Sequence, residues 1–180
     1  MSRLTVFADA DPGAPLLSLT DGEAIAAELK PLGVRFERWS SPVPLSWDDS
    51  AETILEAYRP YLDGLMGETG AGSADVIKLT PDNPQAQALR EKFLQEHIHS
   101  EDEVRFFVAG AGNFVLHLNG KIYDARCEQG DLISVPAGTK HWFDAGDKPS
   151  FIALRVFTDA SGWVAQFTGD DISNRFPAVV

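Results

Sequence analysis

The chain has 180 residues, with 15 lysines and arginines against 27 aspartates and glutamates, so its formal net charge is −12. Its single cysteine excludes an internal disulfide and any zinc site built mainly from thiolates, and the negative charge argues against nucleic acid or an anionic membrane as partner. No apolar run reaches the roughly 20 residues that a membrane helix needs, and the N-terminus lacks the pattern of a secretory signal, so we expect a cytoplasmic protein.

The first 33 residues predict one strand and one helix. Residues 4–8 are apolar enough for a short strand, and the sequence Asp11-Pro12-Gly13 predicts a turn after it. Asp21 is a suitable N-cap for the helix, because its side chain can accept a hydrogen bond from a free amide of the first turn. Gly33 is a suitable end for the same helix.

Residues 34–95 predict two further helices. Ser50 or Thr53 would cap the first of them, and Pro60 should kink or split it because proline removes one amide donor and clashes with the preceding turn. The second is expected to open at Asn83-Pro84, since proline is favoured at the first helical position. Two short strands are expected in this part of the chain, at residues 34–39 and 76–79.

After residue 96 the pattern is that of short strands separated by glycine, proline, asparagine and aspartate. The strongest break is Asn119-Gly120, which predicts a two-residue hairpin with a type I′ turn. Gly110-Ala111-Gly112 is interpreted as a loop. Strands at this spacing indicate a sandwich or small barrel, with the N-terminal helices outside it. The predicted strands are residues 103–108, 113–118, 121–127, 132–135, 140–144, 151–157 and 163–167.

These patterns predict one domain over residues 1–180. It would consist of a portion with helices and strands (1–95), a barrel core (96–168) and a C-terminal tail (169–180).

The first group of chemically active residues is the sequence His97-Ile98-His99 with Glu103 four residues further on. Side chains of an extended chain repeat every second residue, so His97 and His99 are expected to face the same way. Glu103 and Arg105 share that parity, and a bend at residues 100–102 would break it. Two imidazoles and a carboxylate suit iron(II), nickel(II), manganese(II) or zinc, and they leave positions open for a substrate. The alternative is an ordinary pair of hydrogen-bonded histidines near acidic residues.

A second group is a strand that ends in a tight turn and delivers His141. Gly130 precedes the strand, and Pro136 and Gly138 form the turn. Turns of this kind fix the position of the residue that follows, as a metal ligand requires.

Together the two groups resemble the two motifs of the cupin superfamily. The resemblance implies a mainly β (α+β) fold, a cupin-type double-stranded β-helix or jelly-roll barrel with the N-terminal helices packed outside. Glu91 and Ala145 depart from the glycine and asparagine of the motifs, and neither is at a ligand position. The resemblance implies one metal site, with the ligands His97, His99, Glu103 and His141.

Arg105 and Arg155 are arginines within otherwise apolar strands. An arginine in such a position is rarely buried without an anionic partner. Each either pairs with an internal carboxylate, such as Asp102 or Asp131, or holds an anionic substrate bidentately. The catalytic interpretation is favoured for Arg105, and both interpretations stay open for Arg155.

Phe93, Phe143 and Trp163 are candidates for the wall of the pocket, although aromatic residues of a small barrel are often plain core. His117 has the parity opposite to its apolar neighbours and is interpreted as an ordinary strand histidine. Cys127 is interpreted as structural, because the adjacent acid opposes formation of a thiolate.

Over nearly its whole length the chain resembles the bacterial acireductone dioxygenase family. The resemblance is carried by EHIHSEDEVRFFVAGAG, CEQGDLISVPAGTKHWFDAG and GWVAQFTGDDIS, and upstream by GVRFERW and PDNPQAQALREKFL. It implies oxidative cleavage of 1,2-dihydroxy-5-(methylthio)pent-1-en-3-one by O2 in methionine salvage. Two alternatives are another cupin enzyme, such as a sugar isomerase or epimerase, and a ligand-binding module without activity.

The resemblance also implies one Fe(II) or Ni(II) per chain. In this family iron is associated with formate and 2-oxo-4-methylthiobutanoate as products, and nickel with methylthiopropanoate, formate and carbon monoxide. Both metals accept the same ligands, so the sequence does not choose between them. We expect a monomer that acts on a small molecule.

Overall fold

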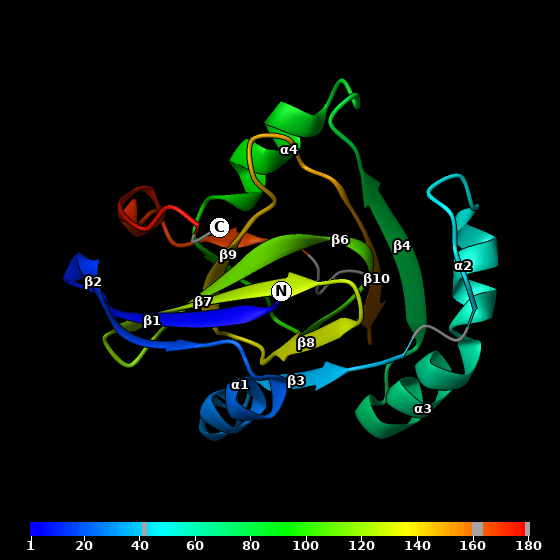
Figure 1. The fold of residues 1–180 in the computed structure, drawn as a ribbon, viewed down its shortest axis with the longest axis horizontal. Helices are drawn as coiled ribbons and strands as arrows, with labels where there is room; N and C mark the ends of the chain where they lie inside the picture. The colour runs from blue at the N-terminus through cyan, green and yellow to red at the C-terminus, as the bar shows by residue number, and fades with distance from the viewer. Residues whose placement is uncertain (41–42, 160–163, 179–180) are drawn as a thin grey trace.

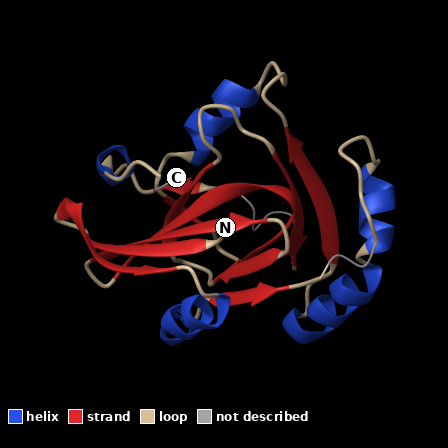
Figure 2. Ribbon diagram, in the orientation of Figure 1, coloured by secondary structure: helices blue, strands red, loops and turns tan. Residues whose placement is uncertain are grey.

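Two antiparallel sheets share one long strand, β6 (Glu103–Leu118), in the computed structural model, which describes residues 1–40, 43–159 and 164–178. Figure 2 shows that the strands occupy the centre of the molecule and that the helices lie on its outside. The predicted mainly β architecture with external helices is confirmed.

One sheet contains the second half of β6, and the other contains the first half. The first sheet has the order β11 (Gln166–Phe167), β5 (His97–Ile98), β9 (Lys140–Asp144), β6, β7 (Lys121–Glu128), β1 (Arg3–Ala8) and β2 (Asp11–Leu19). The second has the order β4 (Ser73–Leu79), β10 (Phe151–Phe157), β6, β8 (Asp131–Val135) and β3 (Arg35–Arg38).

The prediction of a loop at Gly110-Ala111-Gly112 is wrong, because β6 runs through it without interruption. Gly110 has φ +73, and a Cβ there would lie 2.0 Å from the backbone oxygen of Ser150. A Cβ on Gly112 would lie 2.3 Å from the ring of Phe143. These glycines therefore let one strand bend between the two sheets while neighbouring atoms approach closely.

Gly110→Ala is expected to destabilise the fold by about 3 kcal/mol or more, because a left-handed backbone and a backbone clash are combined at this position. Urea unfolding monitored by circular dichroism measures the change. The control is Gly67→Ala within α3 (Arg59–Thr69), where a Cβ meets nothing within 4 Å. That substitution should stabilise the protein by roughly 0.5–1 kcal/mol. Equal stability of the two variants would contradict the prediction.

The described residues form an apolar core of three parts, which the sheets separate. The first lies between the sheets and includes Phe107, Phe114 and Phe151. The second lies between the outer face of the β10-containing sheet and the helices α2 (Ala51–Ala57) and α3, which Figure 1 shows beyond β4. The third lies on the outer face of the other sheet under the C-terminal segment η3 (Ile172–Arg175). β10 has apolar residues on both faces because both faces are covered: Phe151 and Ala153 belong to the first part of the core, Ile152 and Leu154 to the second.

Most of the predicted helix signals are confirmed. Asp21 caps α1 (Gly22–Leu29), and Ser50 caps α2 by accepting a hydrogen bond from the amide of Thr53. Gly33, with φ +76, ends the short 3-10 helix η1 (Lys30–Leu32) that follows α1. Pro60 lies at the start of α3, so the predicted second helix is split there.

Two predictions near proline are corrected. Asp11-Pro12-Gly13 begins β2 and is not a closing turn. The helix expected at Asn83-Pro84 is α4 (Ala86–Phe93), which starts two residues beyond the proline. The Asn119-Gly120 hairpin is confirmed, since both residues have positive φ, as a type I′ turn requires. Among the described residues, no helix is long and apolar enough to cross a membrane.

Candidate metal centre

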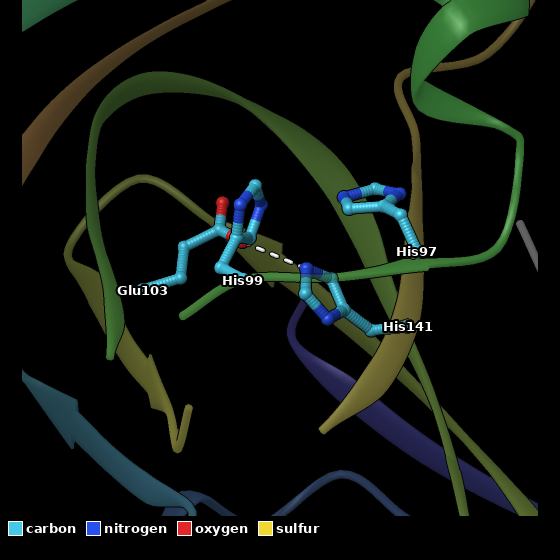
Figure 3. Close-up of side chains that lie close together, drawn as sticks. All are labelled: His97, His99, Glu103 and His141. Carbon is cyan, nitrogen blue, oxygen red and sulfur yellow. Dashed lines mark hydrogen bonds and ion pairs between the residues drawn. The ribbon is translucent and has the colours of Figure 1, made fainter. Parts of the chain in front are cut away.

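Three imidazoles and one carboxylate converge on the inner side of the barrel (Figure 3). All four side chains are buried, and their candidate ligand atoms lie within 4.8 Å of one another. The group consists of the four predicted ligands His97, His99, Glu103 and His141.

Strand pairing and one turn bring these residues together from distant parts of the sequence. His97 of β5 lies directly opposite His141 of β9. The turn before β9 is fastened to the segment that carries His99, because the amide of Gly138 donates to the carbonyl oxygen of His99 at 2.9 Å. The carboxylate of Asp102 accepts a further hydrogen bond from the amide of Ala137 at 2.9 Å.

Hydrogen bonds to backbone carbonyls orient two of the imidazoles. Nδ1 of His97 donates to the carbonyl oxygen of Gln95 at 2.6 Å, and Nδ1 of His141 donates to that of Thr139 at 2.7 Å. Because Nδ1 carries the proton in both rings, Nε2 is the atom left with a lone pair for a metal.

The ionisation states also suit a metal. Burial and the neighbouring His141 lower the pKa of His97 to about 4, which keeps its imidazole neutral at physiological pH. Burial alone would raise the pKa of Glu103, but the charge of Arg105 and the close approach of the His141 and His99 imidazoles outweigh it and hold the pKa well below its ordinary value. His97 thus offers a neutral imidazole and Glu103 an ionised carboxylate, the forms that bind metal.

The spacing of the donor atoms fits a single metal ion. Ligand atoms about 2.1 Å from a metal are about 3.0 Å apart at right angles and about 3.4 Å apart at tetrahedral angles. Oε2 of Glu103 lies 2.8 Å from Nε2 of His141 and 3.4 Å from Nε2 of His99. The four residues therefore form a metal-binding group with nitrogen and oxygen donors.

Arg105 lies next to this group and is buried. Its guanidinium donates to Oε1 of Glu103 at 3.0 Å, the carboxylate oxygen that faces away from the imidazoles. Three aromatic rings surround the guanidinium, those of Phe143, Phe114 and Phe93, with centroids at 5.0, 5.3 and 5.9 Å. Aromatic faces attract a cation, so the position of Arg105 is closely defined.

Arg155 lies directly opposite Arg105 in the pairing of β10 with β6. It makes two hydrogen bonds to the carboxylate of Asp75, at 2.8 and 2.6 Å. Asp75 was not among the predicted partners. Asp102 instead accepts from the Ala137 amide, and Asp131 accepts from Arg38 and Ser2.

A cavity of about 330 Å³ opens beside the metal-binding group. Phe143 is buried behind Arg105 in the core and is absent from the described lining, while Trp163 lies outside the described residues. The sequence did not point to Lys92 or to the apolar residues of the C-terminal segment, which reach the cavity only through tertiary folding. The lining consists of Lys92, Phe93, His97, His99, Arg105, Arg155, Val164, Ala165 and Phe167.

Cys127 is not among the described residues that line this cavity. Cys127 is fully buried in the core between the sheets, and burial raises its pKa well above the ordinary value. Its buried position is that of a structural side chain.

The antiparallel barrel with three histidines and one glutamate on its inner face defines a metal-binding cupin. The model of the ARD/ARD′ family matches residues 3–165. The chain therefore belongs to the ARD/ARD′ family.

Similar proteins match this chain over nearly its whole length. The acireductone dioxygenase of Acidiphilium cryptum is 72% identical over 177 residues, which cover 98% of each chain. That of Granulibacter bethesdensis is 66% identical over 178 residues, covering 99% of each chain. The structure of acireductone dioxygenase from Bacillus anthracis, with a cadmium ion in its active centre, superposes with a TM-score of 0.82 at 29% identity and covers 93% of this chain and 98% of that one.

Proposed function

We propose that this chain catalyses the oxidative cleavage of acireductone by O2 in methionine salvage, with one Fe(II) or Ni(II) held by His97, His99, Glu103 and His141. The observation that carries the proposal is the buried metal-binding group beside Arg105, in a cavity large enough for a small molecule. The family and the names of the similar proteins supply the substrate class.

The charges of the site suit an anionic substrate. Three neutral imidazoles and one carboxylate leave a divalent metal with one net positive charge. When bound, the metal supplies Lewis acidity and two adjacent open positions for the oxygens of the substrate. Arg105, buried between aromatic rings, adds a fixed positive charge that orients those oxygens.

The rest of the cavity consists of a paired arginine and of apolar side chains. Arg155 contributes less free charge than Arg105, because Asp75 pairs with it bidentately. Phe93, Val164 and Phe167 offer apolar surface to the side chain of the substrate and exclude water from it.

The metal decides the products in this proposal. Fe(II) gives formate and 2-oxo-4-methylthiobutanoate, whereas Ni(II) gives methylthiopropanoate, formate and carbon monoxide. The usual affinity order of nitrogen and oxygen ligands favours nickel, and the supply of each metal in the cell can reverse that order.

Anaerobic reconstitution with Fe(II) or with Ni(II) tests the function. After acireductone and O2 are added, we expect each loaded form to consume both together and to yield the products given for that metal. O2 uptake and gas and organic acid analysis measure the result, with metal-free protein as the control. Turnover of a sugar without O2, or saturable binding without O2 uptake, would contradict the proposal.

A further inference from the structure

Glu96 is a buried carboxylate immediately before the ligand His97, and only 1% of its surface is exposed. Nδ1 of His117 donates to its Oε2 at 2.7 Å, and the hydroxyl of Thr168 donates to its Oε1 at 2.8 Å. The backbone amide of Thr168 also donates to the carbonyl oxygen of Glu96, at 3.1 Å. We call these contacts of Glu96 with His117 and Thr168 the Glu96 clasp.

The clasp joins a rigid part of the barrel to a segment with little burial of its own. His117 lies on the long strand β6, and its Nε2 is 3.4 Å from Oδ2 of Asp9. Thr168 directly follows β11, whose two residues are both exposed and pair with β5. Because β11 is held by a short ladder and buries little, the hydrogen bonds to Glu96 contribute much of what keeps it in place.

The segment held by the clasp forms one wall of the cavity. Val164, Ala165 and Phe167 line it, and the ring of Phe167 lies 6.0 Å from that of His97. Val164 is 66% exposed and Phe167 47% exposed, so both have apolar surface that a bound apolar group would cover. A wall of this kind favours a hydrocarbon or thioether tail over a polar one.

We propose that Glu96 and Thr168 are positioning residues that hold this wall against the side chain of the substrate, and so set selectivity for its tail. This inference rests on the proposed function. Glu96 suits the role because a carboxylate with several donors is held in one geometry, and the donors come from separate parts of the chain. The same contacts give His117 a function that its place in the sequence did not suggest.

Thr168→Val tests the clasp, because valine keeps the shape of threonine and removes the hydroxyl. We expect one metal per chain, a nearly unchanged kcat, and a KM for the methylthio substrate that rises about tenfold, as for other losses of apolar fit. For an acireductone whose tail is shortened to a methyl group, KM should change little. Thr168→Ser, which keeps the hydroxyl, should restore the wild-type values, and Thr20→Val at an exposed threonine is the control.

Hydrogen exchange of the metal-loaded protein provides a readout that does not depend on turnover. Thr168→Val removes the hydrogen bond to the Glu96 carboxylate and the one that the hydroxyl accepts from the Asp170 amide. It should speed amide exchange at residues 166–168 about tenfold or more and should leave β9 and β10 unchanged. Equal KM changes for both substrates, or no change in exchange, would overturn the clasp. If the wild type failed to turn over acireductone, the proposed function would fail, and the exchange comparison would still decide whether Thr168 holds this segment.

Discussion

His99→Ala is expected to abolish stoichiometric metal binding and, with it, activity. The imidazole of His99 lies 3.4 Å from Oε2 of Glu103 within the buried ligand group, so its removal leaves three ligands and a hole that water must fill. We expect affinity for Ni(II) to fall by about 100-fold or more, since loss even of groups that only support ligands costs 10–100-fold. Metal analysis after dialysis measures the effect.

Thermal unfolding is a second measurement of the metal binding that His99→Ala is expected to lose. A metal that binds only the folded protein stabilises it in proportion to the logarithm of its concentration over Kd, so Ni(II) should raise the Tm of the wild type. The rise should disappear in His99→Ala and persist in His117→Gln, which alters the histidine that faces away from the ligand group. Full metal content in His99→Ala would refute the ligand assignment.

The features of the fold that were predictable from sequence are those that depend on neighbouring residues. The Asn119-Gly120 turn and the caps Asp21 and Ser50 act through hydrogen bonds and backbone angles within a few residues. The bend at Gly110 was not predictable in this way. Its cause is the approach of Ser150, 40 positions away, and the same glycine pattern is typical of a loop.

In the candidate site, too, the residues that depend on local sequence were predictable and those that depend on distant pairing were not. His97 and His99 were predictable because residues two apart on an extended chain face the same way, and His141 because a tight turn delivers it. Glu103 lies beyond a bend at residues 100–101, at the start of β6, so its place in the group depends on the fold. The partner of Arg155 was not, since Asp75 meets it only through the pairing of β10 with β4. The role of Phe167 likewise depends on the pairing of β11 with β5. This pairing could not be predicted from a strand of two exposed residues.

Arg105→Met is expected to keep one metal per chain at neutral pH and to lower kcat/KM by about 10²–10³-fold, the usual effect of removing one donor that stabilises developing negative charge. Methionine fills a similar volume among Phe93, Phe114 and Phe143, so the packing of the core should be preserved. Steady-state kinetics with metal-loaded enzyme, together with metal analysis, measures both expectations.

Arg155→Met is the comparison that shows whether the loss of kcat/KM in Arg105→Met comes from removing its positive charge or only from changing a residue that lines the cavity. Asp75 already offsets the charge of Arg155, so the loss of Arg155 should reduce kcat/KM less than the loss of Arg105.

Arg105 also opposes the effect of burial on the pKa of Glu103. In Arg105→Met that pKa should rise, so a proton competes with the metal and metal binding weakens as pH falls, more steeply than in the wild type. An Arg105→Met variant that lost its metal already at neutral pH would show that the arginine serves the metal site rather than the substrate.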